Sequence, residues 1–237
     1  MKFKALLATA ALLVAPLTHA AFVTIDEVGM DTVFSQASFS SKIDIRIGAV
    51  TQIANTSLLD INTPARLNTL FGLHVGASNV VNFYFVDTID ECGGFNVNIV
   101  GCGEFPGNDF VVESSFAALT GDDPDGAAFP GISTAVNLLA HELGHNLGLD
   151  HSGGGLMFAS ISNNGLLSVG EANAILANGG FQLVQTDANG QLFIQINPIL
   201  IVRDAVNDVP VPSTLALVLA AALFAGSRLR AQHASRR

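Results

Sequence analysis

The stretch from His141 to His151, which reads HExxHxxGxxH, constrains this chain more than any other feature. On a helix, His141 and His145 lie on one face, near enough to bind one Zn²⁺. Gly148 adopts a positive φ without steric cost, so it can end the helix and let the chain turn back. His151 can then serve as a third ligand. Glu142 can reach a water on the metal and accept its proton.

Hydrophobic periodicity around this motif predicts a helix from about residue 131 to Leu147. At about 100° per residue, the apolar side chains form one narrow stripe. His141 and His145 fall on the opposite side, where residues lining a cleft would lie. Histidines satisfied inside a buried core, the alternative interpretation, would lie within the stripe. The stripe consists of Ile132, Val136, Leu139, Leu143 and Leu147.

A second motif follows the third histidine directly. Residues 152–157 form a glycine-rich segment that ends in Met157. Together the two motifs resemble the metzincin clan of zinc endopeptidases, in which a tight turn carries a methionine beneath the metal. The alternative is that Met157 only fills the core, as methionine often does. Some metzincins have a tyrosine ligand two residues later, and because that position is Ala159, none is expected here.

The resemblance implies an α+β fold of the zincin type. We expect a twisted, mostly parallel sheet with an antiparallel edge strand, packed on the active-site helix, and a small C-terminal subdomain after His151. The resemblance also implies a helix beyond the methionine turn. Ser168 and Glu171 have capping-box spacing, which predicts a helix that begins there, runs to about Leu176 and ends at residues 178–180.

Segments upstream of the histidine motif have the hydrophobic periodicity of strands and of one helix. Strands are predicted at residues 43–47, 80–86 and 110–114. The last of these is interpreted as the edge on which a substrate strand pairs. Residues 55–71 have helical spacing, which Pro64 disturbs.

The segment after the expected helix has the pattern of a β-hairpin. Its arms are predicted at residues 181–185 and 191–197, around a turn at 187–190 that contains Asn189-Gly190. His74 stands alone far upstream and is interpreted as a structural residue.

Both ends of the chain have the pattern of targeting signals. Residues 1–20 combine a basic start with an apolar run and end in Ala20, which predicts a cleaved secretory signal peptide. Residues 209–237 combine a Pro-Val-Pro segment, an apolar run and four arginines. They resemble the PEP-CTERM sorting signal of Gram-negative bacteria, which implies an exosortase-type partner. The alternative is a short transmembrane anchor.

Between these ends, residues 21–208 are predicted to form one exported metalloprotease domain. Its expected location is the cell surface, the periplasm or outer membrane, or the medium after sorting. All 20 acidic residues of the chain lie between Asp26 and Asp208. A domain surface this rich in acidic residues repels nucleic acid, so no nucleic-acid partner is expected. It either favours divalent cations and basic substrates or is a solvated exterior, the simpler interpretation. Its only basic residues are Lys42, Arg46, Arg66 and Arg203.

Cys92 and Cys102 are the only cysteines, and in an exported chain they are predicted to form a disulfide. The alternative is a cysteine that blocks the zinc reversibly, as in some metzincin propeptides. The sequence signature of that switch is absent.

Residues 122–126 place three carboxylates in one turn. Clustered oxygens can bind Ca²⁺. The usual calcium loop with its distant glutamate is missing, which favours a solvated loop.

These observations favour a zinc endopeptidase, secreted or anchored at the surface, that cleaves protein or peptide substrates. In this hypothesis His141, His145 and His151 bind one Zn²⁺ as neutral imidazoles, and Glu142 is the general base. Asp150 is interpreted as a surface residue. The alternative is a catalytically idle matrix or adhesion protein that keeps a metal for stability. Glu142 argues against it, because a purely structural zinc site needs no general base.

Overall fold

The structure, a computed structural model, describes residues 25–117, 132–160, 164–177 and 181–204. The described residues up to Arg203 belong to one compact unit, and the chain from Asp204 on falls almost wholly outside the described range. The predicted signal peptide, the sorting signal and the acidic turn at 122–126 also lie outside it. No helix in the described residues is long and apolar enough to cross a membrane.

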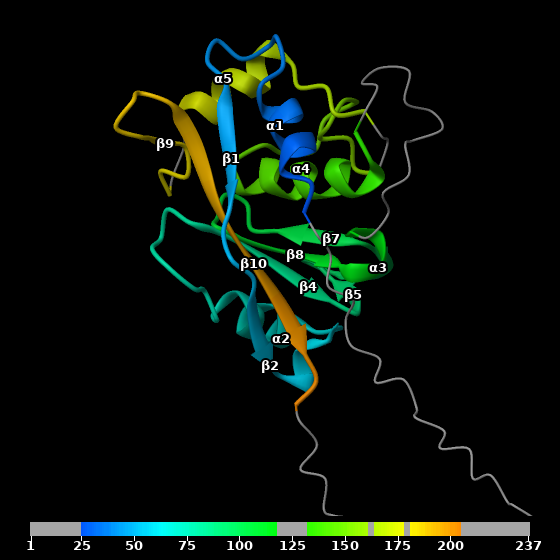
Figure 1. The fold of residues 1–237 in the computed structure, drawn as a ribbon. Coiled ribbons are helices and arrows are strands. Elements are labelled where there is room, and N and C mark those ends of the chain that lie inside the picture. Colours follow the sequence, from blue (N-terminus) through cyan, green and yellow to red (C-terminus); the bar gives the residue numbers. More distant parts are fainter. Residues whose placement is uncertain (1–24, 118–131, 161–163, 178–180, 205–237) are drawn as a thin grey trace, which may run out of the picture. The chain divides into compact units, whose positions relative to one another are not determined.

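The described part of the chain is a mixed α+β fold (Figure 1). Its helical elements are α1 (Glu27–Phe34), η1 (Thr56–Leu58), α2 (Pro64–Phe71), α3 (Ser114–Ala117), α4 (Thr134–Asn146) and α5 (Val169–Ala177). Its strands are β1 (Ile43–Ile47), β2 (Thr51–Ala54), β3 (Asp60–Ile61), β4 (Val81–Val86), β5 (Thr88–Glu91), β6 (Phe95–Ile99), β7 (Gly101–Gly103), β8 (Asp109–Glu113), β9 (Gln185–Thr186) and β10 (Leu192–Val202).

One sheet dominates this fold, with the strand order β1-β10-β4-β8-β7. β10 is parallel to β1, β2 and β4, and β4 is parallel to β8. Among the described strands of this sheet, β7 and β9 run antiparallel to their neighbours. A smaller sheet has the order β3-β5-β6. The expected α+β fold class and mostly parallel sheet are confirmed.

Strand β10 departs from the sequence expectation. A hairpin is expected at residues 181–197, and a small subdomain is expected after His151. Instead, β10 runs between β1 and β4 through the middle of the main sheet (Figure 1), and only β9 pairs with it as a short hairpin arm. The residues of β10 from Ile199 to Ile201 are all buried, so they need cover on both faces of a sheet. The chain after His151 therefore returns to the main sheet.

The strand at the sheet edge nearest α4 also differs from the predicted one. β8 pairs with β4 on one side and with β7 on the other, so the predicted edge role of residues 110–114 is wrong. The edge is β7, which is antiparallel and in contact with α4. A three-residue strand that reads Gly-Cys-Gly carries no alternating pattern, which is why sequence periodicity misses it.

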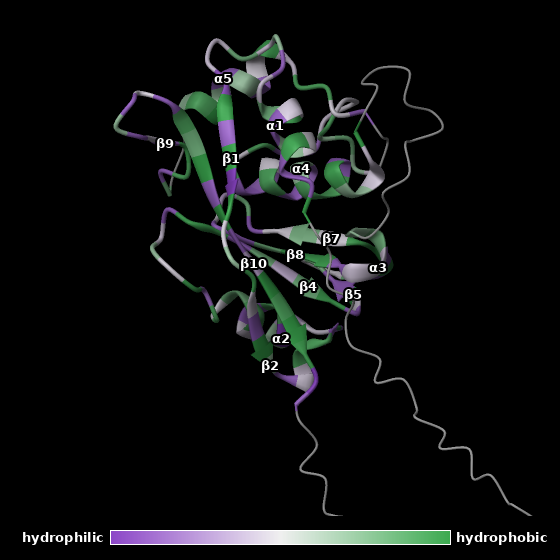
Figure 2. Ribbon diagram, viewed as in Figure 1, coloured by the Kyte–Doolittle hydropathy of each residue, from purple (hydrophilic) through white to green (hydrophobic). Residues whose placement is uncertain are grey.

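The core lies on both faces of the central strands, which are mostly apolar in Figure 2. Every residue of β4 is buried, as expected for a strand covered on both faces. On one face the Tyr84 ring lies 6.3 Å from the ring of Phe71 in α2. Residues of the predicted α4 stripe, from Ile132 to Leu147, are at most 4 % exposed, so the stripe is confirmed as core.

Pro64 begins a helix rather than disturbing one. The expected helix at 55–71 is replaced by η1, the short strand β3 and then α2. Thr63 caps α2 by accepting a hydrogen bond from the N–H of Arg66 at 3.3 Å, and Pro64 occupies the first turn. Proline suits that position because its fixed φ is helical and its missing N–H would have no partner there.

Two local predictions after His151 are confirmed. The N–H of Ser168 donates to the Glu171 carboxylate at 2.7 Å, and the N–H of Glu171 donates to Ser168 Oγ at 3.2 Å, which completes the capping box of α5. At the hairpin turn, the N–H of Gly190 donates to the carbonyl of Asp187 at 3.0 Å. Residues 178–180, the expected end of the helix, lie outside the described residues.

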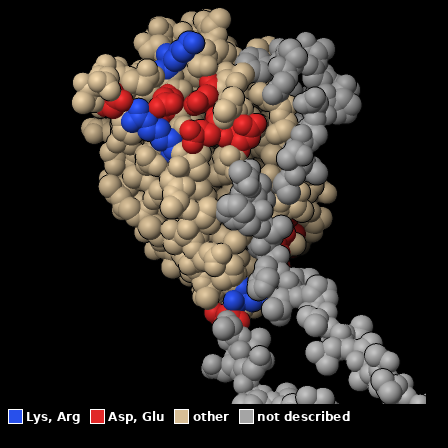
Figure 3. Space-filling view, in the orientation of Figure 1, with Lys and Arg blue, Asp and Glu red and all other residues tan. Residues whose placement is uncertain are grey.

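Charged side chains gather on the face that carries α1 and β1 (Figure 3). Arg46 lies between Asp44 and Asp187, at 2.7 and 2.8 Å. Asp26 caps α1, and Asp31 accepts the N–H of Ile45. These acids thus have structural partners, and among the described residues no group of three or more carboxylates is arranged to hold a metal.

Candidate metal centre

Helix α4 carries the first two histidines, and local capping fixes both of its ends. Ser133 begins it by accepting the N–H of Val136 at 3.2 Å. At the other end Gly148 has φ +86°, and its N–H donates to the His145 carbonyl at 2.9 Å. The N–H of Leu149 donates to the Gly144 carbonyl at 2.9 Å, which completes a Schellman motif. The expected turn at Gly148 is confirmed.

The turn brings His151 to the other two histidines. One ring nitrogen from each of His141, His145 and His151 lies within 4.8 Å of the others. The Nε2 atoms of His145 and His151 are 3.2 Å apart. Two nitrogens on one tetrahedral zinc at 2.0–2.1 Å would be separated by roughly 3.3 Å. The three histidines therefore form a group that can hold a metal ion.

The two helical histidines are held with Nε2 directed away from their backbone partners. His141 Nδ1 lies 2.7 Å from the carbonyl of Leu156, and His145 Nδ1 lies 2.8 Å from the carbonyl of Leu149. Because a carbonyl only accepts, each Nδ1 carries the proton and each Nε2 keeps a lone pair. Metal-binding histidines are typically oriented in this way.

Burial keeps these two rings neutral. It lowers the pKa of His141 to about 4, and it also lowers the pKa of His145. Both rings are thus unprotonated near pH 7, which is the form that binds a metal.

Glu142 lies beside the cluster under strand β7 and is 5 % exposed. Burial raises the pKa of its carboxyl to about 8, and the hydrogen bond with the Gly103 backbone opposes this effect. A divalent cation nearby would lower the pKa again, because it favours the carboxylate.

Strand β7 approaches this carboxylate closely because it has two glycines. A Cβ at Gly101 would lie 2.7 Å from the carboxyl carbon of Glu142, and a Cβ at Gly103 would lie 3.1 Å from the Cβ of His145. Sequence reasoning missed both positions. The Gly-Cys-Gly segment is a usable signal, since glycine in a strand often marks a close backbone approach.

Met157 is fully buried beneath α4. A Cβ added at Gly144, between the two helical histidines, would meet Met157 Sδ at 2.5 Å. The N–H of Ser152 donates to the Met157 carbonyl at 2.8 Å, so residues 152–157 close into a tight turn. The methionine is therefore part of the core, and it packs against the segment of α4 that carries the two histidines.

The histidines and Glu142 line a cleft of about 960 Å³. Its rim includes the loop that the disulfide between Cys92 and Cys102 closes, and this confirms the predicted pairing. Apolar and polar side chains alternate on this rim, and those of Phe95 and Val97 are 70 % and 65 % exposed. Asp150 also lines the cleft, where its carboxylate accepts the N–H of His151.

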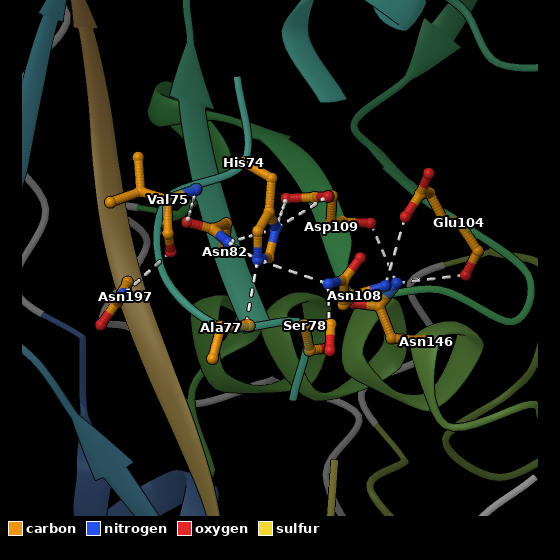
Figure 4. A network of polar contacts seen from close by, with 10 residues as sticks. All are labelled: His74, Val75, Ala77, Ser78, Asn82, Glu104, Asn108, Asp109, Asn146 and Asn197. Atoms are coloured by element: carbon orange, nitrogen blue, oxygen red, sulfur yellow. Dashed lines mark hydrogen bonds and ion pairs between the residues drawn. The ribbon is translucent and has the colours of Figure 1, made fainter. Parts of the chain in front are cut away.

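His74 belongs to a polar network that braces the end of α4 (Figure 4). Its Nδ1 lies 3.0 Å from the buried carboxylate of Asp109, whose pKa is raised by burial. Asn146, the last residue of α4, donates from Nδ2 to the carbonyls of Asp109 and Glu104 at 2.9 and 3.1 Å. His74 is thus a structural residue, as expected, and the network fixes α4 to β8 beside His145.

Replacing Gly148 with alanine should destabilise the protein by roughly 1–2 kcal/mol, because an L side chain at positive φ meets the following carbonyl. The matched control is Gly170→Ala in α5, where the nearest atom to an added Cβ is Ser168 Oγ at 3.8 Å. That change should be neutral or stabilising. Urea denaturation of both variants measures the difference. Equal stability of the two variants would contradict the role assigned to Gly148.

No family model matches the chain, and no curated protein or solved structure is significantly similar to it. The likeness to metzincins therefore depends on the motif and on the geometry around the three histidines.

Proposed function

We propose that the chain is a zinc-dependent endopeptidase of the metzincin type. The observation that carries the proposal is the convergence of His141, His145 and His151, with two Nε2 atoms 3.2 Å apart. A buried glutamate beside them and an open cleft supply the other parts that peptide hydrolysis needs. The signal peptide and the sorting segment belong to the same proposal, in which the enzyme is exported and acts at or beyond the cell surface.

His141, His145 and His151 would hold the metal, and a set of three neutral imidazoles suits catalytic Zn²⁺. When bound, zinc supplies a Lewis acid that polarises a carbonyl and lowers the pKa of water. The carbonyls of Leu156 and Leu149 keep the two helical rings in the required tautomer.

Glu142 moves the protons in this proposal. As a carboxylate it accepts a proton from the attacking water, and as a carboxylic acid it returns that proton to the leaving amine. Its burial under β7 keeps it beside the histidines, and the glycines of β7 leave room for it. A general base of this kind is what separates the proposal from an idle metal-stabilised adhesion protein.

The cleft suits an extended peptide. β7 is the end strand of the sheet, so its outer side can pair with a substrate strand in the cleft. The exposed rings of Phe95 and Phe158 line the cleft and can provide apolar contacts for substrate side chains.

Metal analysis together with a protease assay tests the function. The purified exported domain should contain one zinc per chain and should cleave casein or gelatin. A chelator should remove both the zinc and the cleavage, and added Zn²⁺ should restore them. Zinc retained at one per chain with no cleavage of either substrate would favour the adhesion or matrix alternative instead.

A further inference from the structure

The turn between β7 and β8 carries an exposed aromatic ring that the proposed chemistry does not use. Phe105 is 56 % exposed and lines the cleft. The planes of its ring and of the His145 ring are nearly perpendicular, at 86°, and the two ring centroids are 6.3 Å apart. A large apolar side chain is thus accessible from the cleft, directly beside one of the three histidines.

Hydrogen bonds hold this turn against the end of α4. The N–H of Glu104 donates to the Asp109 carbonyl at 3.1 Å. The carbonyl of Asn146 accepts the N–H of Gly107 at 3.3 Å, and its side-chain Nδ2 donates to the Glu104 carbonyl at 3.1 Å. The backbone on both sides of Phe105 is therefore fixed, so its ring can meet a ligand at little cost in conformational entropy.

Phe105 belongs to a group of exposed apolar side chains at the cleft. Large apolar residues that are exposed singly are normal on a protein surface, whereas a group of them marks an interaction site. Four line the cleft, and three of these are aromatic: Phe95, Val97, Phe105 and Phe158. Glu113 and Asp150 also line it, but no lysine or arginine does among the described residues. A ligand carboxylate would find no cation of the chain there, so the group suits an apolar ligand.

We propose that Phe105 is a specificity-determining residue, whose ring contacts an aromatic side chain of the substrate close to the scissile bond. This inference rests on the proposed endopeptidase function and assigns it a substrate class. An extended peptide advances about 3.3 Å per residue, so the 6.3 Å between the rings of Phe105 and His145 spans about two residues. The favoured substrates are thus peptides with phenylalanine, tyrosine or tryptophan within about two residues of the cut.

Two physical arguments favour an aromatic side chain of a peptide as the occupant. Aromatic rings in contact attract each other beyond the effect of the apolar area that they bury. An extended peptide in the cleft of about 960 Å³ can contact Phe105 and reach the three histidines at once, whereas a flat membrane surface cannot enter the cleft.

Cleavage of a peptide library by the zinc-loaded protein tests the assignment, with the cut sites mapped by mass spectrometry. The wild-type protein should cut peptides with an aromatic residue at the preferred position about tenfold faster than peptides with alanine there. Phe105→Ala should reduce this preference to about twofold, mainly through a higher KM, and should keep one zinc per chain. Phe105→Tyr retains the ring and should keep the preference.

The matched control is Phe181→Ala, which removes an exposed ring that does not line the cleft. This variant should keep the wild-type preference. Because hydrogen bonds of neighbouring residues hold the turn at Phe105, the Phe105 variants should fold with a Tm close to that of the wild-type protein.

Binding supplies a second readout that does not depend on turnover. In a Glu142→Gln background, a phenylalanine-containing peptide should bind about tenfold more tightly than its alanine analogue. Adding Phe105→Ala should reduce that difference to about twofold.

Three results would overturn the assignment, and they are distinguishable. If Phe105→Ala cuts with the wild-type preference, the role of Phe105 is wrong while the proposed function stands. If the same variant also converts a dimer into a monomer in size-exclusion chromatography, the ring contacts a second copy of the chain instead. If the wild-type protein cuts no peptide at all, the proposed function fails and the specificity fails with it.

Discussion

Replacing Glu142 with glutamine should reduce peptide cleavage by about 10²–10⁴-fold, the contribution of a general acid–base group. Glutamine fills the same buried space under β7, but it cannot accept the proton of the attacking water. Zinc content should stay at one per chain, because the three histidines are unchanged. Steady-state kinetics and metal analysis on the same preparation measure both quantities.

Glu171→Gln is the matched control for this change. Glu171 belongs to the capping box of α5, in which glutamine also serves, and it does not line the cleft. This variant should cleave at the wild-type rate. A Glu142→Gln protein that retained wild-type activity would remove Glu142 from the mechanism, whatever the zinc content.

Replacing His145 with alanine should abolish both zinc binding and cleavage. The three ring centroids form a triangle with separations of 4.8, 4.8 and 5.4 Å, so the loss of His145 leaves two of the three rings at the site. Zinc at 1,000 times its Kd stabilises a protein by about 4.1 kcal/mol, which for a domain of this size raises Tm by roughly 8–16 °C. The wild-type protein should show this rise, and His145→Ala should show none.

His74→Gln separates metal binding from folding in this experiment. His74 is hydrogen-bonded to Asp109 and lies outside the histidine cluster, so its replacement should affect stability without removing the zinc-dependent rise in Tm. If zinc raised the Tm of His145→Ala as much as that of the wild-type protein, the three histidines would not be the binding site.

The metal cluster could be predicted from the sequence because its geometry is local. His141 and His145 are one turn apart on α4, and Gly148 reverses the chain within a few residues to bring back His151. The capping box of α5 and the turn before β10 are local in the same sense. Hydrogen bonds within a few residues decide each of them, so residue types at fixed spacing were sufficient.

The position of β10 could not be predicted in this way. The sequence shows an apolar segment after a turn, and a hairpin with its preceding neighbour is the simplest interpretation. Its insertion between β1 and β4 depends on which distant strands leave their faces uncovered, and no local pattern carries that information. The error over the sheet edge has the same origin, because β7 is recognisable only from its partner β8.

Residue patterns alone predicted the three histidines that can hold a metal, the turn that brings them together and the disulfide, because each depends on residue identity at short range. The surroundings of these features came from long-range packing. It placed the glycines of β7 against Glu142, Met157 under Gly144, and Phe105 beside His145. Those neighbours come from segments far apart in the chain, and their meeting depends on how helix and sheet pack.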